Sequence, residues 1–96
     1  MYGTVARMRV AQGREEELAR LAESYRDLGI PGFIASYTYR TDADPREHWL
    51  AVIFEDRESY VRNANDPAQD RRFREMRALL EADPEWHDGE VVAGPR

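Results

Sequence analysis

The sequence predicts an α+β fold in which an antiparallel sheet carries all of its helices on one face. The run His48–Glu55 is apolar at nearly every position. Such a run indicates a central strand covered on both faces, and it is too short for a buried helix of about 10–12 residues. Elsewhere the hydrophobic spacing changes between the strand period and the helix period, which gives the order β-α-β-β-α-β.

The first half of the chain predicts a strand, a helix and a second strand. Over residues 2–10, apolar side chains alternate with two arginines, as in a half-buried strand. A stripe at helical spacing then predicts an amphipathic helix from residue 14 to Gly29. Its members are Leu18, Leu21, Ala22, Tyr25 and Leu28. Residues 33–40 predict a second strand with one aromatic-rich face, formed by Phe33, Ala35, Tyr37 and Tyr39.

After the central strand, the sequence predicts two helices and a last strand. Asp56 is placed to cap a short helix, and Asp66 is placed to cap a second one. The buried stripe of the second helix is expected at Phe73, Met76, Leu79 and Leu80. Residues 86–93 predict a last strand with an irregularity at Gly89.

This order is the ferredoxin-like, or split β-α-β, arrangement. Its helices cover only one face of the sheet, yet the central strand also presents Trp49 and Ile53 to the other face. A second sheet, packed face to face about a two-fold axis, would cover them. A chain of 96 residues without cysteine also has few other ways to gain stability. We therefore expect a homodimer built from one domain that spans residues 1–96.

Composition limits the partners of the chain. The net charge is −5, and arginine supplies all fourteen cations, which argues against nucleic acid as a ligand. One basic cluster is interleaved with acids, as on a solvated helix face; it comprises Arg71, Arg72, Arg74 and Arg77. No apolar run approaches the roughly 20 residues that span a bilayer. The lack of cysteine and of a signal-like N-terminus favours the cytoplasm.

Three blocks of the sequence resemble one known family. Val10–Leu18 combines a strand end, a glycine turn and an acidic helix start; Gly29–Phe33 reads Gly-x-Pro-Gly-Phe; and Phe54–Tyr60 follows the central strand. On these blocks the chain resembles the antibiotic-biosynthesis-monooxygenase-like group of the dimeric α+β barrel superfamily. The resemblance implies a dimeric α+β barrel, but this superfamily contains several chemistries and some non-enzymes, so the fold alone does not give the function.

The resemblance implies two chemistries that individual residues can test. One is haem degradation, which requires an Asn in the first strand, a Trp at the end of the third and a His on the following helix. This chain has Ala6, Phe54 and no histidine at those places, so haem is not expected. The other is cofactor-independent oxygenation, in which an apolar pocket holds an electron-rich ring and polar groups stabilise its anion. Many such members carry a His where this chain has Asn63, which can still hydrogen-bond a phenolate or quinone oxygen.

The expected ligand site lies between the sheet and the helices. Its walls are Met8, Phe54, Phe73 and Met76, with polar recognition from Asn63 and Tyr60; no catalytic residue is assigned. A wider aromatic set forms either a ligand cavity or simply the core, which is the commoner role of such rings. This set is Tyr37, Tyr39, Tyr60, Phe73 and Trp86.

Each of the two histidines is considered for a ligand site or a metal site. His48 can line the mouth of a pocket, although a histidine at the start of a strand is more often a surface residue. His87 and Asp88 are adjacent on a predicted strand, so they point to opposite faces and are poorly placed to pair. Neither histidine shows a metal-ligand spacing with the scattered acids, so we expect no metal.

The sequence thus predicts a cofactor-independent monooxygenase-like protein that acts on a small aromatic or polyketide-like compound. The alternative is a non-catalytic dimeric module that binds a small ligand or assists a neighbouring enzyme. An enzyme requires a cavity that reaches solvent, with Asn63, Tyr60 or an arginine directed into it. A structural module would instead fill that space with apolar side chains, namely Phe54, Phe73 and Met76.

Overall fold

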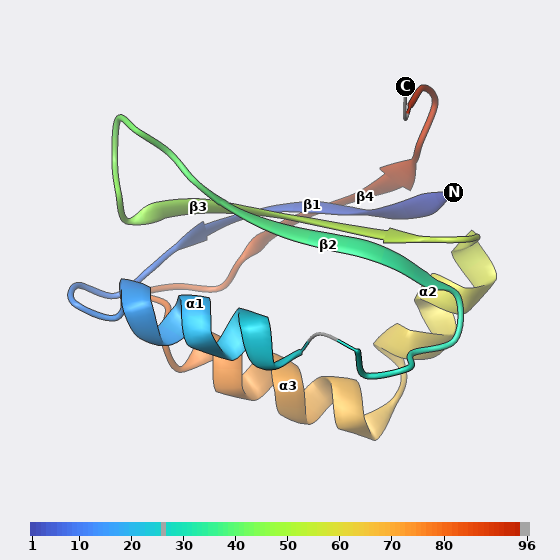
Figure 1. Cartoon of the computed structure of the whole chain (residues 1–96), viewed down its shortest axis with the longest axis horizontal. Helices are drawn as coiled ribbons and strands as arrows, with labels where there is room; N and C mark the ends of the chain where they lie inside the picture. The colour runs from blue at the N-terminus through green and yellow to red at the C-terminus, as the bar shows by residue number, and fades with distance from the viewer. Residues whose placement is uncertain (26, 95–96) are drawn as a thin grey trace.

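A computed structural model of the chain describes residues 1–25 and 27–94. Its elements follow the predicted order (Figure 1). They are β1 (Tyr2–Arg9), α1 (Glu15–Ser24), β2 (Phe33–Arg40), β3 (Glu47–Phe54), α2 (Arg57–Ala64), α3 (Pro67–Arg77) and β4 (Glu85–Glu90). The α+β, ferredoxin-like fold class predicted from the sequence is therefore confirmed.

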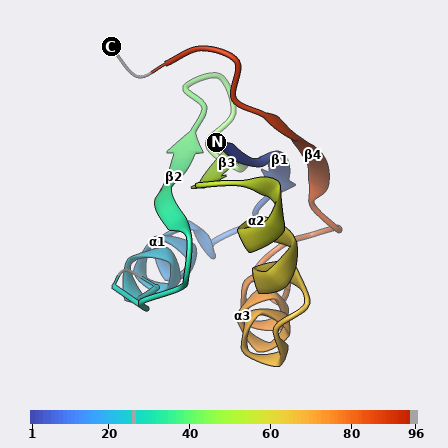
Figure 2. The ribbon, with the colours of Figure 1, turned by 90° about the vertical axis from the view of Figure 1, so that its right-hand side faces the viewer.

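The four strands form one antiparallel sheet in the order β2-β3-β1-β4. All three helices lie against one face of it, and the opposite face carries no helix in the part of the chain that is described (Figure 2). Burial along β1 follows this arrangement, since Thr4, Ala6 and Met8 face the helices and are buried, whereas Val5 and Arg7 are exposed. The central position of β3 between β2 and β1 agrees with its nearly continuous apolar sequence.

The buried core occupies one end of the space between sheet and helices. Its residues come from the end of β1, from α1 and from the segment after α3, and they are Met8, Val10, Leu18, Leu79 and Leu80. Leu21, Leu50 and Met76 pack against them. Ala6 and Phe54 are buried outside this cluster.

The sequence places the ends of the first and the last helix later than the structure does. α1 ends at Ser24, so Leu28 lies outside the helix and is 44% exposed. Asp27 has φ 58°, a left-handed conformation that Asp tolerates and that a right-handed helix excludes. α3 likewise ends at Arg77, so the buried Leu79 lies in the turn beyond it.

Two predictions for the outer strands are also wrong. Phe33 pairs with Phe54 but Ala35 pairs with Ile53, so a bulge between them places Phe33 on the opposite face from the rest of its predicted stripe. The inserted residue reverses the alternation at that point. β4 stays in regular register through Gly89 and ends at Glu90, without the predicted irregularity.

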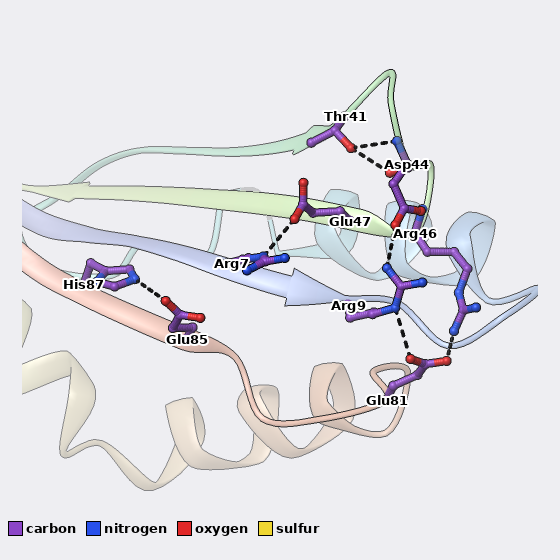
Figure 3. A network of polar contacts seen from close by, with 9 residues as sticks. All are labelled: Arg7, Arg9, Thr41, Asp44, Arg46, Glu47, Glu81, Glu85 and His87. Carbon is purple, nitrogen blue, oxygen red and sulfur yellow. Dashed lines mark hydrogen bonds and ion pairs between the residues drawn. The ribbon is translucent and has the colours of Figure 1, made fainter.

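A polar network fixes the β2–β3 loop to the rest of the fold (Figure 3). Arg9 lies at the centre, with its guanidinium 2.6 Å from Asp44 Oδ2 and 3.2 Å from Glu81 Oε2. Arg46 also pairs with Glu81. The hydrogen bond from Arg9 lowers the pKa of Asp44, and the backbone N–H of Arg46 contributes to the same effect. Exposed ion pairs are weak singly, but this network joins three segments around the end of β1.

Candidate functional site

A cleft of about 1070 Å³ lies between the sheet and the helices and opens to solvent. All six residues predicted for the ligand site contribute to its lining: Met8, Phe54, Tyr60, Asn63, Phe73 and Met76. They come from β1, β3, α2 and α3, so the fold brings together residues that are far apart in the sequence. Whether they bind a ligand stays a prediction.

Aromatic rings line the α2 end of the cleft. Phe54 contacts Phe33 and Tyr60 edge to face, each with a centroid distance of 5.7 Å. Tyr60 in turn contacts Tyr2 at 5.3 Å. Phe73 lies 6.0 Å from Trp86, on the side formed by α3 and β4. These rings pack against one another along the walls, and the space between the walls remains open.

The predicted aromatic set is divided between the two faces of the sheet. Tyr60, Phe73 and Trp86 have the contacts just described on the helix-facing side. Tyr37 and Tyr39 pair with Ala51 and Trp49, positions of β3 on the opposite face, and they are 68% and 61% exposed. Neither tyrosine belongs to the buried core, and Tyr37, unlike Tyr39, still contributes to the lining of the cleft.

Tyr60 and Asp88 form a polar pair at the α2 end of the cleft. The Tyr60 hydroxyl donates to Asp88 Oδ1 at 2.8 Å. Burial and the hydrogen bond to Asp88 raise the pKa of Tyr60 to about 12, so its phenol stays protonated near neutral pH. Thr4 faces Asp88 in the β1–β4 register, and its buried hydroxyl interacts with the Tyr60 phenol, which partly opposes the rise in the Tyr60 pKa.

Asn63 lies on the inward side of α2 and is half-buried. Its Oδ1 accepts a long hydrogen bond of 3.5 Å from the Arg72 guanidinium, which also donates to Gln69 Oε1 at 3.1 Å. The prediction of a solvated basic face is therefore wrong for Arg72, which is half-buried and lines the cleft. The prediction of a solvated face agrees with Arg74, which is exposed and forms an ion pair with Asp70.

His48 is more deeply buried than expected for a residue at the start of a strand. It is 6% exposed, lies on the helix-facing side of β3 and lines the cleft. Its Nδ1 is buried and has no hydrogen-bond partner within the described residues. Burial lowers the pKa of His48, and the charge of Arg40 adds to this effect. Its alternation in phase with Leu50 and Phe54 was the sequence signal for this position.

His87 and Asp88 separate as predicted. The His87 ring contacts Glu85 (Figure 3), with Nε2 3.0 Å from Oε1. Asp88 instead accepts a hydrogen bond from Tyr60 on the cleft side. Among the described residues, no group of three or more His, Asp and Glu side chains is arranged to hold a metal ion. None of the helices described has the length and apolar character needed to cross a membrane.

Comparison with protein families gives one match. The profile of the family described as antibiotic biosynthesis monooxygenase (ABM) matches residues 1–75. The chain belongs to the ABM family. A comparison with curated protein sequences finds no significant match.

Solved structures support the ABM fold over nearly the whole chain. A Chloroflexus aurantiacus protein described as an antibiotic biosynthesis monooxygenase has a TM-score of 0.81 and 22% identity, covering 99% of this chain and 96% of that one. SnoaB, a cofactor-independent oxygenase from Streptomyces nogalater, has a TM-score of 0.76 and 20% identity, with coverage of 97% and 94%. The NE2512 protein of unknown function from Nitrosomonas europaea has a TM-score of 0.80 and 18% identity, with coverage of 99% and 92%. At such identities, the similarity supports the fold alone.

Proposed function

We propose that this ABM-family chain is a cofactor-independent monooxygenase-like protein that binds a small aromatic or polyketide-like compound in the cleft. The observation that carries the proposal is the open cleft of about 1070 Å³, with Asn63, Tyr60 and Arg72 on its lining. Phe54, Phe73 and Met76 contribute to the lining of the cleft, and the space beside them is open. The structural similarity to SnoaB, a cofactor-independent oxygenase, agrees with this proposal.

The proposed chemistry places an electron-rich ring between apolar walls. If an activated CH₂ of the ring becomes a carbonyl, one atom of dioxygen enters the product and the other leaves as water. The substrate then supplies all the electrons, and no external reductant is needed. The protein's part is to orient the ring, exclude water and stabilise its anion through polar groups.

Dioxygen uptake tests this proposal. Purified protein treated with a chelator is mixed with electron-rich polycyclic phenols and quinols, and uptake is followed with an oxygen electrode against heat-denatured protein. We expect uptake matched mole for mole by an oxygenated product. A compound that stabilises the protein in a thermal-shift assay without any uptake would instead favour the non-catalytic ligand-binding module.

The proposed assembly is a cytoplasmic homodimer of one domain spanning residues 1–96, formed through the helix-free face of the sheet. That face presents Val5, Tyr37 and Tyr39, which are exposed, together with the half-buried Trp49 and Ile53. Contiguous apolar surface of this kind is typical of a protein interface. A second copy packed about a two-fold axis would cover it and complete a dimeric α+β barrel.

A further inference from the structure

Strand β2 has the reverse of the usual polarity for a sheet that packs helices against one face. Its polar residues Ser36, Thr38 and Arg40 face the helices, because each pairs with a helix-facing residue of β3. Tyr37 and Tyr39 alternate with them on the opposite face. A strand that covers a core normally places apolar side chains toward the helices and polar ones toward solvent. The inward side of β2 is therefore a polar wall and not a part of the core.

The three polar side chains are open to the cleft. All of them are exposed and line it. Among the described residues, neither hydroxyl has a hydrogen-bond partner, and the Arg40 guanidinium has neither a hydrogen bond nor an ion pair. Glu15 also lines the cleft and acts on the neighbouring His48, but it forms no ion pair with Arg40. The donors of this wall are thus available to a molecule that enters the cleft.

An apolar floor lies beside the polar wall. β1 and β3 supply it on the same side of the sheet, through Met8, Leu50, Val52 and Phe54. Alternate residues of a strand are about 6.6 Å apart, so the two hydroxyls and the guanidinium form a row about 13 Å long. A flat molecule that rests on the floor meets this row along one edge. The row is longer than a single ring, which favours a ligand of several fused rings.

We propose that the inward side of β2 recognises the oxygen-bearing edge of a polycyclic ligand that carries a carboxylate. Arg40 binds the carboxylate, because a guanidinium matches its two oxygens with paired N–H donors. Thr38 and Ser36 donate hydrogen bonds to carbonyl or hydroxyl oxygens further along the same edge. The inference rests on the proposed function for the aromatic part of the ligand, and it involves no reaction with dioxygen.

Arg72 also lines the cleft, but its guanidinium is held differently. Its Nε donates to Gln69 Oε1 at 3.1 Å, and its Nη2 donates to Asn63 Oδ1 at 3.5 Å. These amides occupy part of the Arg72 guanidinium, whereas the side-chain N–H donors of Arg40 have no partner in the described part of the chain. The carboxylate is therefore assigned to Arg40, and variants of both arginines test the assignment.

Two anthraquinones that differ at one substituent test the proposal. Anthraquinone-2-carboxylate carries the acidic group and a ring carbonyl along one edge, and anthraquinone-2-carboxamide is the matched neutral ligand. Calorimetry with the intact protein at neutral pH gives the dissociation constant of each. For the wild type, we expect the carboxylate to bind about ten times more tightly than the carboxamide, because hydrogen bonds between charged groups are the stronger ones.

Variants of the wall and of α3 separate the contributions. Arg40→Gln should abolish the preference for the carboxylate, whereas Arg72→Gln should retain it. The double variant Ser36→Ala/Thr38→Val should weaken both ligands about fivefold and leave the preference unchanged. Arg71→Gln removes an exposed arginine that does not line the cleft, and it should behave as the wild type.

Equal binding of the two ligands by the wild type would overturn the proposal, as would the absence of binding. A preference that survives Arg40→Gln would also overturn it, and its loss in Arg72→Gln would move the carboxylate to α3. Dioxygen uptake with phenols and quinols is a separate measurement. A carboxylate preference that depends on Arg40, without any uptake, would therefore count against the oxygenase proposal alone.

Discussion

At the scale of single residues, the polar groups of the cleft differ in how firmly neighbouring side chains hold them. Tyr60 makes a short hydrogen bond to Asp88, whereas Asn63 has a long one from Arg72. An amide with one weak partner can change partners at little cost when a ligand enters. Asn63 is therefore the residue whose loss should affect ligand binding more than folding.

Asn63→Ala should weaken binding of a phenol- or quinol-like ligand by about 1–3 kcal/mol, roughly a factor of 5–150 in affinity. Asn65→Ala is the matched control, because Asn65 is exposed and does not line the cleft. A thermal-shift series with a panel of aromatic and polyketide-like compounds measures the difference. Equal stabilisation of the wild type and Asn63→Ala would remove Asn63 from the site, and unfolding of Asn63→Ala would assign it a structural role.

His48 should make the stability of the protein depend on pH. Its pKa is lower in the folded chain than in the unfolded chain, so the unfolded state binds more protons as the pH falls below about 6.5. The stability linked to neutral His48 is present above the unfolded pKa and is lost as the pH falls through the folded pKa. His48→Phe should show a smaller decrease in Tm than the wild type over this range, with His87→Gln as control. Parallel curves for the wild type and His48→Phe would contradict this assignment.

At the scale of elements, hydrophobic periodicity predicts the order and the type of every helix and strand, but not all of their limits. The apolar stripe of the first helix continues to Leu28, yet the left-handed Asp27 ends the helical path before that residue. The bulge that moves Phe33 to the cleft side changes a pairing register, which a strand's own pattern does not determine. The spacing of apolar residues predicts neither the left-handed conformation of Asp27 nor the bulge beside Phe33.

Most of the candidate site was predictable because its walls belong to strongly periodic elements. Met8, Phe54, Phe73 and Met76 follow from strand alternation and the helical stripe. Arg40 was not among the predicted site residues, because its position beside His48 depends on how β2 and β3 pair across a long loop. A sequence pattern alone leaves that pairing open.

The close approach of β1 and β3 leaves no room for a side chain at Gly3. A Cβ at this position would overlap the backbone carbonyl of Val52 on the neighbouring strand, and backbone cannot move aside cheaply. Gly3→Ala should therefore destabilise the fold by about 1–3 kcal/mol or more, as overpacking does. Gly89 is opposite Gly3 on β4, with nothing within 4 Å of its added Cβ, so Gly89→Ala is the control. Equal denaturant midpoints for the two variants would contradict the close approach.

At the scale of the whole molecule, the two faces of the sheet have different roles in the proposal. One face and the helices enclose the cleft, and the other is the proposed dimer interface. Trp49 and Ile53 alternate with His48 and Phe54 along β3, so a single strand contributes to both surfaces. The proposed interface would account for the apolar character of the central strand at nearly every position.

Trp49→Glu tests the dimer, since it would place an unpaired charge in the proposed interface. Size-exclusion chromatography with light scattering should give a dimer for the wild type and a monomer or an unfolded chain for the variant. Val92→Glu adds the same charge at a position that is 93% exposed, and it should leave the mass unchanged. A well-folded wild-type monomer at micromolar concentration would contradict the assembly.

A crystal structure of the chain with an aromatic compound that raises its Tm tests the central claim most directly. The account predicts that the compound lies in the cleft between the sheet and the helices, with its ring against Phe54 and Phe73 and an oxygen near Asn63 or Arg40. The claim would be contradicted by a cleft closed through repacking of Phe54, Phe73 and Met76, with the compound bound elsewhere on the surface.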